Sequence, residues 1–230
     1  MLWNDEGAQM FPESGRCHPD TVDIQIPTVS NIGMAVRLRR AEQVERNRGA
    51  VLDAARRVFI QRGYAGASLE AIAEEAGFSK GVVYSQFGSK PDLFFALLER
   101  RIEERAAKND RIVAQSDGVD ALRELIQAAH REAATESGWP HVLTEFRALA
   151  MRDPELNHRY AEAHSRTVTS LASALSRLYE RAGVQPMVPV RSLAEFFLGA
   201  AAGVALERAA NPNALPDSDL AQLTARAVGL

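Results

Sequence analysis

The amino-acid sequence predicts an all-α protein, and three observations support this fold class. Apolar residues recur at helical spacing along most of the chain: Leu69, Ile72, Ala73 and Ala76, for example, follow the i, i+3, i+4, i+7 pattern of one helix face. Serine, aspartate or proline opens several of these runs, and glycine or proline closes most of them. No stretch alternates apolar and polar residues with the period of two that a half-buried strand requires. We therefore expect a three-helix unit, a connecting helix and a larger helical bundle.

The composition is that of a soluble globular protein. The chain has 230 residues, of which 46% are apolar and 25% are charged, and its net charge is −3. The lone Cys17 cannot form an internal disulfide. The longest apolar run, Phe196 to Leu206, is shorter than the roughly 20 residues that span a bilayer. The N-terminus lacks the pattern of a signal peptide. We expect a cytoplasmic protein with no membrane partner and no cofactor.

The first part of the chain changes character near Met34. Residues 1–36 carry one basic and five acidic residues and no apolar period, which is typical of a disordered tail. Translation can start at Met1 or at Met34, and the sequence leaves both open. Residues 37–90 carry ten basic and six acidic residues, a net charge of +4. Such local positive charge is typical of a surface that faces nucleic acid, and it also occurs on ordinary solvated helices.

The helices after the tail have recognisable ends. The first ends at Gly63, and Ser68 caps a second that ends at Gly77. A third begins after Ser79 and runs to about Phe87. A fourth opens with Ser89-Lys90-Pro91-Asp92, in which serine caps, proline lies in the first turn and aspartate follows three residues after the cap.

The second and third helices form a helix-turn-helix pattern. Gly77 permits the sharp turn, and Phe78, Val83 and Phe87 are predicted to point inward. The opposite face of the third helix carries side chains suited to phosphates and base edges in the major groove. These are Lys80, Gly81, Tyr84 and Ser85. Glycine inside a helix costs about 1 kcal/mol relative to alanine, and close approach to a ligand would offset that cost.

Residues 51–93, VLDAARRVFIQRGYAGASLEAIAEEAGFSKGVVYSQFGSKPDL, resemble the DNA-binding domain of the tetracycline-repressor (TetR) family. The matching positions are Gly63-Tyr64, Ile72-Ala73, Ala76-Gly77, Gly81, Tyr84, Phe87 and Ser89-Lys90. The departures are Ala67, Val82 and Gln86, and they bear on the operator sequence. The resemblance implies contacts from Ser68, Lys80, Gly81, Tyr84 and Lys90. The full set of expected contacts with double-stranded operator DNA is Arg46, Arg48, Ser68, Ser79, Lys80, Gly81, Val82, Tyr84, Ser85, Gln86 and Lys90.

The remaining chain predicts five more helices, at about Val119 to Thr135, His141 to Met151, Pro154 to Arg181, Arg191 to Ala209 and Ser218 to Val228. The helix from Arg191 is apolar nearly all round, so every face must be covered. A second subunit would cover it through Phe197, Ala201, Val204, Leu206, Leu220 and Leu223. A central core helix of a monomer is the alternative.

The resemblance implies a division into a DNA-binding domain at 37–92 and an effector-binding and dimerisation domain at 93–230. Bulky apolar side chains with a few polar tips suit a cavity for a small, mostly hydrophobic effector. The candidates are Trp139, Phe146, Tyr160, His164, Phe196 and Phe197, each of which fits an ordinary core position as well. The resulting expectation is a dimeric repressor that binds a near-palindromic operator and is released by its effector.

Two other functions fit the sequence less well, and a third is left open. A di-metal enzyme in a helical bundle needs two Glu-x-x-His pairs, and only Glu155 to His158 shows one. We therefore expect no catalytic or metal-binding residues. A nonspecific architectural DNA-binding protein would carry a strong overall positive charge. An activator remains open, because the sign of regulation depends on where the operator lies.

Overall fold

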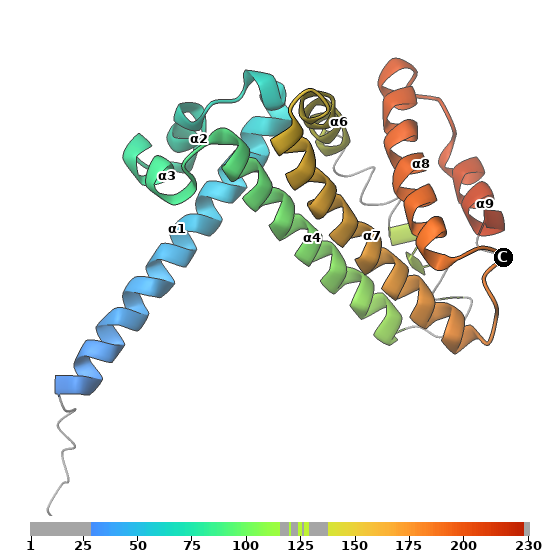
Figure 1. The fold of residues 1–230 in the computed structure, drawn as a ribbon, viewed down its shortest axis with the longest axis horizontal. Helices are drawn as coiled ribbons and strands as arrows, with labels where there is room; N and C mark the ends of the chain where they lie inside the picture. The colour runs from blue at the N-terminus through green and yellow to red at the C-terminus, as the bar shows by residue number, and fades with distance from the viewer. Residues whose placement is uncertain (1–28, 116–119, 121–123, 126, 129–137, 228–230) are drawn as a thin grey trace, which may run out of the picture. The chain divides into compact units, whose positions relative to one another are not determined.

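The computed structural model describes residues 29–115, 120, 124–125, 127–128 and 138–227, with side chains from residue 40 onward. Every secondary-structure element in these ranges is a helix (Figure 1). They are α1 (Val29–Gly66), α2 (Leu69–Ala76), α3 (Lys80–Phe87), α4 (Lys90–Gln115), α6 (Trp139–Ala150), α7 (Pro154–Ala182), α8 (Val190–Ala210) and α9 (Asp217–Ala227). The all-α prediction is confirmed. The helix expected at about 119–135 lies largely outside the described residues.

The chain divides into two units, residues 1–43 and residues 44–230. The described part of the first unit is the beginning of α1. This helix starts at Val29, inside the range 1–36 in which we expected a tail. It is interrupted at Gly63, the residue predicted to end it, where φ is +70° and ψ is 172°. Only glycine adopts this conformation without strain, so the chain turns there and continues toward α2.

The helix-turn-helix forms for the local reasons that the sequence indicates. Ser68 has an extended backbone, and its Oγ accepts the Ala71 N–H at 3.1 Å. Gly77 ends α2 with a left-handed φ of +72°, and Phe78 N–H then donates to the Ala73 carbonyl at 2.9 Å. Ser79 differs from expectation. It lies at the cap position of α3, but its side chain makes no capping hydrogen bond there.

Helices α4 and α7 run side by side in the same direction (Figure 1). At the start of α4, Ser89 Oγ accepts the Asp92 N–H at 3.2 Å and donates to the Asp92 carboxylate, as predicted. Three ion pairs then join the helices at one constant offset of 67 residues, with acids on α4 and arginines on α7. They are Asp92–Arg159 at 2.8 Å, Glu99–Arg166 at 3.0 Å and Asp110–Arg177. We call this set the ion-pair ladder.

One hydrophobic core joins the helix-turn-helix to the bundle. Phe59 of α1, Phe94 of α4 and Phe146 of α6 are each less than 2% exposed and belong to one cluster. The rings of Phe94 and Phe146 stack with centroids 4.1 Å apart. The boundary expected between residues 92 and 93 therefore falls inside a shared core. A second cluster joins α4, α7 and the first turns of α8.

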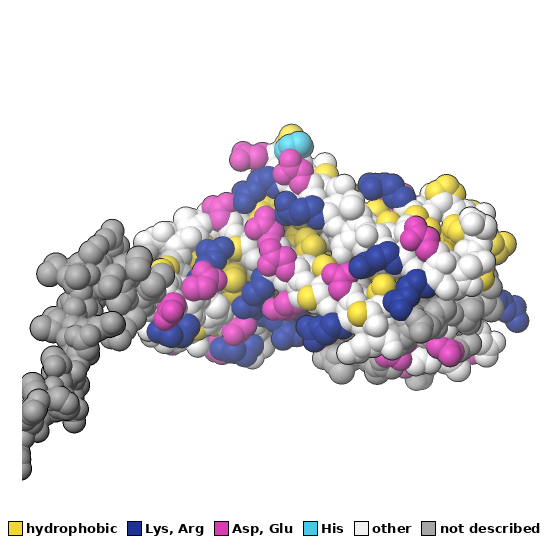
Figure 2. Space-filling model, turned by 90° about the horizontal axis from the view of Figure 1, so that it is seen from below, with side chains coloured by type: hydrophobic (Ala, Val, Ile, Leu, Met, Phe, Trp, Pro, Cys, Tyr) yellow, Lys and Arg dark blue, Asp and Glu magenta, His cyan; other side chains and the backbone are white. Residues whose placement is uncertain are grey.

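The last two helices are sparsely covered. Only Leu193 and Ala194 of α8 are buried, and α9 has no buried residue. Phe196, Leu206 and Leu223 are 59%, 51% and 56% exposed. Figure 2 shows hydrophobic side chains gathered at the end formed by α8 and α9, whereas charged side chains of both signs alternate over the middle. Within one chain, these apolar faces lack a packing partner among the described residues.

Candidate nucleic-acid interface

The exposed face of α3 is the one that the sequence predicted. Val83 and Phe87 are buried in the core, at 0% and 6% exposure. On the opposite side, the Lys80 side chain is 68% exposed and Tyr84 is 45% exposed. Gly81 and Ser85 are also exposed. The hydrophobic anchors thus orient two long polar side chains away from the protein.

Gly81 makes no close packing contact with the described part of the chain. A Cβ built on it would come no closer than 4.0 Å to any considered neighbour, and that neighbour is Ser79 Oγ. Its absence of a side chain is therefore not explained by contacts inside the described part of the chain. Close approach of the α3 backbone to another molecule would explain it.

Three other expected contacts on α3 are less available to DNA than Lys80 and Tyr84. Ser85 Oγ donates to the Val82 carbonyl at 2.9 Å, which directs its hydroxyl to the helix backbone. Gln86 is half-buried, and its Oε1 has no hydrogen-bond partner among the described residues. Val82 is half-buried as well. Val82 and Gln86 therefore lie beside the exposed face, whereas Ser85 lies on it.

The expected cations Arg46 and Arg48 lie in the middle of α1, near the helix-turn-helix. The Arg48 guanidinium lies 4.7 Å from the centroid of the Phe87 ring, so it packs on the end of α3. Arg46 is exposed two residues earlier. Ser68, which resemblance implies as a contact, uses its Oγ to cap α2.

Glu70 of α2 was not anticipated as part of this surface. Its Oε1 accepts the Tyr84 hydroxyl at 3.0 Å and lies 3.8 Å from Lys80 Nζ. Hydrogen bonds from its own backbone N–H and from Tyr84 lower the pKa of Glu70, and the bond to Glu70 raises the pKa of Tyr84. An acid in the first turn of a helix is usually explained by the helix dipole, so nothing in the sequence indicates a contact fourteen residues away.

Lys90 lies at the start of α4 but is directed into the protein. Its ammonium donates to the carbonyls of Tyr64 and Ala67 at 2.9 Å each and to that of Ala65 at 3.4 Å. It also lies 4.6 Å from the centroid of the Tyr64 ring. Burial lowers the pKa of Lys90, and the nearby Glu145 opposes that effect. This lysine therefore fixes the last residues of α1 and Ala67, which lead into α2.

Glu145 of α6 holds the same segment from the other side. Its two carboxylate oxygens accept the N–H groups of Tyr64 at 2.7 Å and Ala65 at 2.9 Å. A Cβ on Gly63 would lie 2.7 Å from Glu145 Oε2, so the carboxylate fills the space that a side chain would need. No pattern in the sequence links these residues, because they are about 80 positions apart. We call Glu145, Lys90 and residues 63–67 the loop clamp.

Most of the expected effector residues lie in packed regions. Trp139, Phe146 and Tyr160 belong to the shared core and are 7%, 0% and 8% exposed. His164 is half-buried and stacks on Tyr160 with centroids 6.0 Å apart, and burial lowers the pKa of His164. On α8, Phe197 packs partly against the second cluster, whereas Phe196 points outward.

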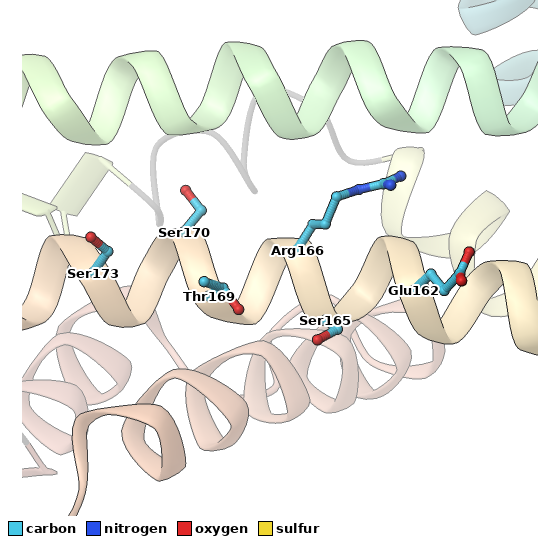
Figure 3. A pocket seen from close by; sticks show the side chains of 6 residues that line it. All are labelled: Glu162, Ser165, Arg166, Thr169, Ser170 and Ser173. Carbon is cyan, nitrogen blue, oxygen red and sulfur yellow. The ribbon is translucent and has the colours of Figure 1, made fainter.

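A groove of about 730 Å³ runs along one face of α7 (Figure 3). It is lined by Glu162, Ser165, Arg166, Thr169, Ser170 and Ser173. Arg166 reaches from this face toward α4, where it joins the ion-pair ladder. These six side chains include none of the expected effector contacts.

Within the described residues, no three histidine, cysteine or acidic side chains come together as metal ligands would. Glu155 is in the first turn of α7, where Asp153 accepts its N–H at 3.0 Å. His158 lies 3.4 Å from Glu162 of the same helix. A search of the described helices for a membrane-spanning segment also finds no candidate.

The fold and this surface define a helix-turn-helix unit built into a helical bundle, which is the architecture of a DNA-binding regulator. Comparison with known proteins agrees. The pattern of the family described as bacterial regulatory proteins, tetR family, matches residues 51–97. The pattern described as BetI-type transcriptional repressor, C-terminal, matches residues 118–229. The chain belongs to the tetR family of transcriptional regulators, and not to a family of enzymes.

Individual relatives support the same family. The chain is 30% identical over 157 residues to the HTH-type transcriptional repressor AcnR of Corynebacterium diphtheriae, covering 68% of this chain and 71% of that protein. It is 36% identical over 93 residues to the HTH-type transcriptional activator FasR of Mycolicibacterium smegmatis, covering 39% and 42%. The solved structure of FadR from Bacillus subtilis in complex with stearoyl-CoA has the same fold, with a TM-score of 0.62 and 19% identity over 78% of this chain and 94% of that one.

Proposed function

We propose that this regulator is a ligand-responsive repressor that binds a near-palindromic operator in the cytoplasm as a homodimer and leaves it when a small effector binds. The exposed face of α3 is the observation that carries the proposal. Lys80 and Tyr84 extend from it, and Gly81 lets its backbone approach a groove. Among the other expected contacts, Lys90 can bind a phosphate only by giving up one of its three carbonyl bonds.

The homodimer is supported by the apolar faces of α8 and α9. Burying an exposed leucine or phenylalanine side chain contributes about 1.5–3 kcal/mol. Leu206 and Leu223 can each contribute in both copies of a two-fold interface. The expected interface residues Ala201, Val204 and Leu220 are also exposed or half-exposed. Two recognition helices on such a dimer reach successive major grooves when they lie about 34–36 Å apart.

The loop clamp provides a route from the bundle to the DNA. Residues 63–67 lead directly into α2, and they are bound by Glu145 of α6 and Lys90 of α4. An effector that favours a different position of α6 therefore also favours a different position of α2 and α3. The effector shifts this equilibrium only as far as its affinities for the two states differ.

The effector class and the sign of regulation rest on the lining of the bundle and on the relatives. A mostly hydrophobic effector would have to separate the packed aromatic residues of α6 and α7, or lie in the groove along α7, which polar and charged residues line. AcnR is named a repressor and FasR an activator, so relatives include both signs. A reporter gene with the selected operator placed over or upstream of a promoter distinguishes them.

Fluorescence anisotropy with purified protein tests the proposal. The probes are DNA from upstream of its own gene, a scrambled duplex of equal composition, and duplexes selected from a random pool. We expect submicromolar binding to one sequence, lost on scrambling, with two chains or a multiple of two per site. Equal, salt-sensitive binding to every duplex would indicate a nonspecific DNA-binding protein. Absence of binding at low salt would refute DNA recognition altogether.

A further inference from the structure

Glu70 joins the two most prominent side chains of the recognition helix. It lies on α2, and its Oε1 accepts the Tyr84 hydroxyl at 3.0 Å while lying 3.8 Å from Lys80 Nζ. Both partners belong to α3, so the contacts cross the turn between the helices. The Glu70 side chain is 39% exposed, which leaves it on the surface that DNA would cover. A carboxylate at such a place repels phosphate and so calls for an explanation.

The hydrogen bond limits what Tyr84 can do. A tyrosine hydroxyl has one proton to donate, and in this structure Glu70 accepts it. The remaining lone pairs of Tyr84 Oη can only accept a hydrogen bond. Phosphate oxygens are acceptors as well, whereas the major groove offers donors in the amino groups of adenine and cytosine. With Glu70 in place, Tyr84 is therefore matched to a base edge and not to the backbone.

The ion pair restrains Lys80 in a similar way. Lysine binds phosphate of any sequence, and this contact supplies much of nonspecific affinity. Lys80 must leave Glu70, or share itself with it, to make that contact. DNA that also donates a hydrogen bond to the Tyr84 hydroxyl offsets the loss of the Lys80–Glu70 ion pair. Other DNA offers no such bond.

We propose that Glu70 is a positioning residue for sequence recognition: it presents Tyr84 Oη as an acceptor to an amino group in the groove and competes with phosphate for Lys80. This inference rests on the proposed DNA-binding function. It concerns the ratio of specific to nonspecific affinity rather than affinity itself. The simpler role of Glu70, an acid that stabilises the N-terminus of α2, predicts an effect on folding and none on that ratio.

The test compares Glu70→Ala with Glu74→Ala, which removes the same charge from an exposed position on the same helix. Each is titrated with a duplex selected by the wild-type protein and with its scrambled form. We expect Glu70→Ala to bind the scrambled duplex more tightly and to lower the specificity ratio by about tenfold. Its plot of log affinity for the scrambled duplex against log salt should steepen by about 1, because Lys80 gains a phosphate. Glu74→Ala should change both duplexes by the same factor.

Tyr84→Phe separates the two parts of the effect. When Glu70→Ala is added to Tyr84→Phe, the salt dependence of binding should still steepen through Lys80. The preference for the selected bases should be lost in Tyr84→Phe alone, so Glu70→Ala should lower it no further. Glu70→Gln keeps an acceptor oxygen for Tyr84 but removes the charge, so it should steepen the salt dependence through Lys80 and keep the base preference, also where the alanine variant melts earlier than the wild type. Equal shifts in Glu70→Ala and Glu74→Ala, with parallel salt plots, would overturn the inference. If the wild-type protein selects no sequence at all, the proposed function fails instead, and the two failures are therefore distinguishable.

Discussion

At Gly81, a change that stabilises the helix is expected to weaken DNA binding. Replacing this glycine by alanine should stabilise α3 by about 1 kcal/mol, because a Cβ there would meet only Ser79 Oγ, at an ordinary contact distance of 4.0 Å. The same methyl group would stand between the backbone and the DNA. We therefore expect Gly81→Ala to raise the melting temperature and to weaken binding to the selected duplex by about tenfold or more.

Gly49→Ala is the matched control for this prediction. Gly49 lies in α1 and also has open space around a built Cβ. It should gain similar stability without loss of DNA binding, as followed by thermal unfolding and anisotropy. Unchanged DNA binding by Gly81→Ala would mean that the backbone of α3 does not approach the groove closely.

Gly63 presents the reverse case, in which the fold itself requires glycine. Its φ of +70° with ψ of 172° costs another residue about 1–3 kcal/mol, and a Cβ would lie 2.7 Å from Glu145 Oε2. Gly63→Ala should lower the free energy of unfolding by at least that amount, measured by urea titration. A loss smaller than about 0.5 kcal/mol would show that the loop clamp relaxes without strain.

At the scale of elements, the ion-pair ladder sets the register between α4 and α7. Its members are spaced by seven residues and then by eleven, or about two and three turns, so they follow one stripe on each helix. Exposed pairs of this kind each contribute about 0–1 kcal/mol. Their effect is therefore to favour one alignment of the helices more than to hold them together.

Asp92 makes one part of this contact dependent on pH. The hydrogen bond from Ser89 is the main cause that lowers the pKa of Asp92 in the folded protein; burial opposes it, and the neighbouring Arg159 lowers that pKa further. Its contribution is complete above the ordinary pKa of about 4 and is lost as the pH falls through the lower, folded value. We expect the difference in urea midpoint between wild type and Asp92→Asn to be constant from pH 7 to about 5 and to shrink at lower pH. Salt should reduce it, because the Asp92 side chain is 43% exposed.

Ser89→Ala provides the comparison. This variant removes the principal cause of the lowered pKa of Asp92. The difference in urea midpoint between Ser89→Ala and the double variant Ser89→Ala, Asp92→Asn should therefore vary less with pH. A wild-type difference that stays constant down to pH 2.5 would contradict the assignment.

At the scale of the whole molecule, the apolar surface of α8 and α9 predicts a dimer that is needed for tight DNA binding. Leu206→Glu combined with Leu223→Glu places four charges in a two-fold interface. We expect a monomer in sedimentation velocity and a loss of operator affinity of about a hundredfold, because one recognition helix then binds without its partner. Val44→Glu, a similar change at a residue that is 51% exposed on α1, should remain dimeric.

Local signals made much of the fold and of the recognition surface predictable. Ser68, Gly77 and the capping box at Ser89 act within a few residues, and they lie where the sequence indicates. The side of α3 that is exposed follows from helical spacing alone. Ser79 shows the limit of such reasoning, because a favourable residue at the cap position does not ensure the capping bond.

The parts that could not be predicted depend on contacts distant in sequence. Glu145 and Lys90 contact residues 63–67 from positions about 80 and 25 residues away. A glutamate or a lysine at these positions does not by itself indicate such a contact. Aromatic residues at helical spacing look alike whether they line a cavity or fill a core. Trp139 and Phe146 therefore looked like effector contacts, and the structure places them in the packing between α4 and α6.

The shared core has a consequence for protein engineering. Grafting residues 44–92 onto the bundle of another regulator would leave Phe59 and Tyr64 against foreign side chains in place of Phe94 and Phe146. It would also leave the N–H groups of Tyr64 and Ala65 without their carboxylate. A sensor assembled from such parts would need α4, Glu145 and the aromatic residues of α6 transferred together with the recognition helix.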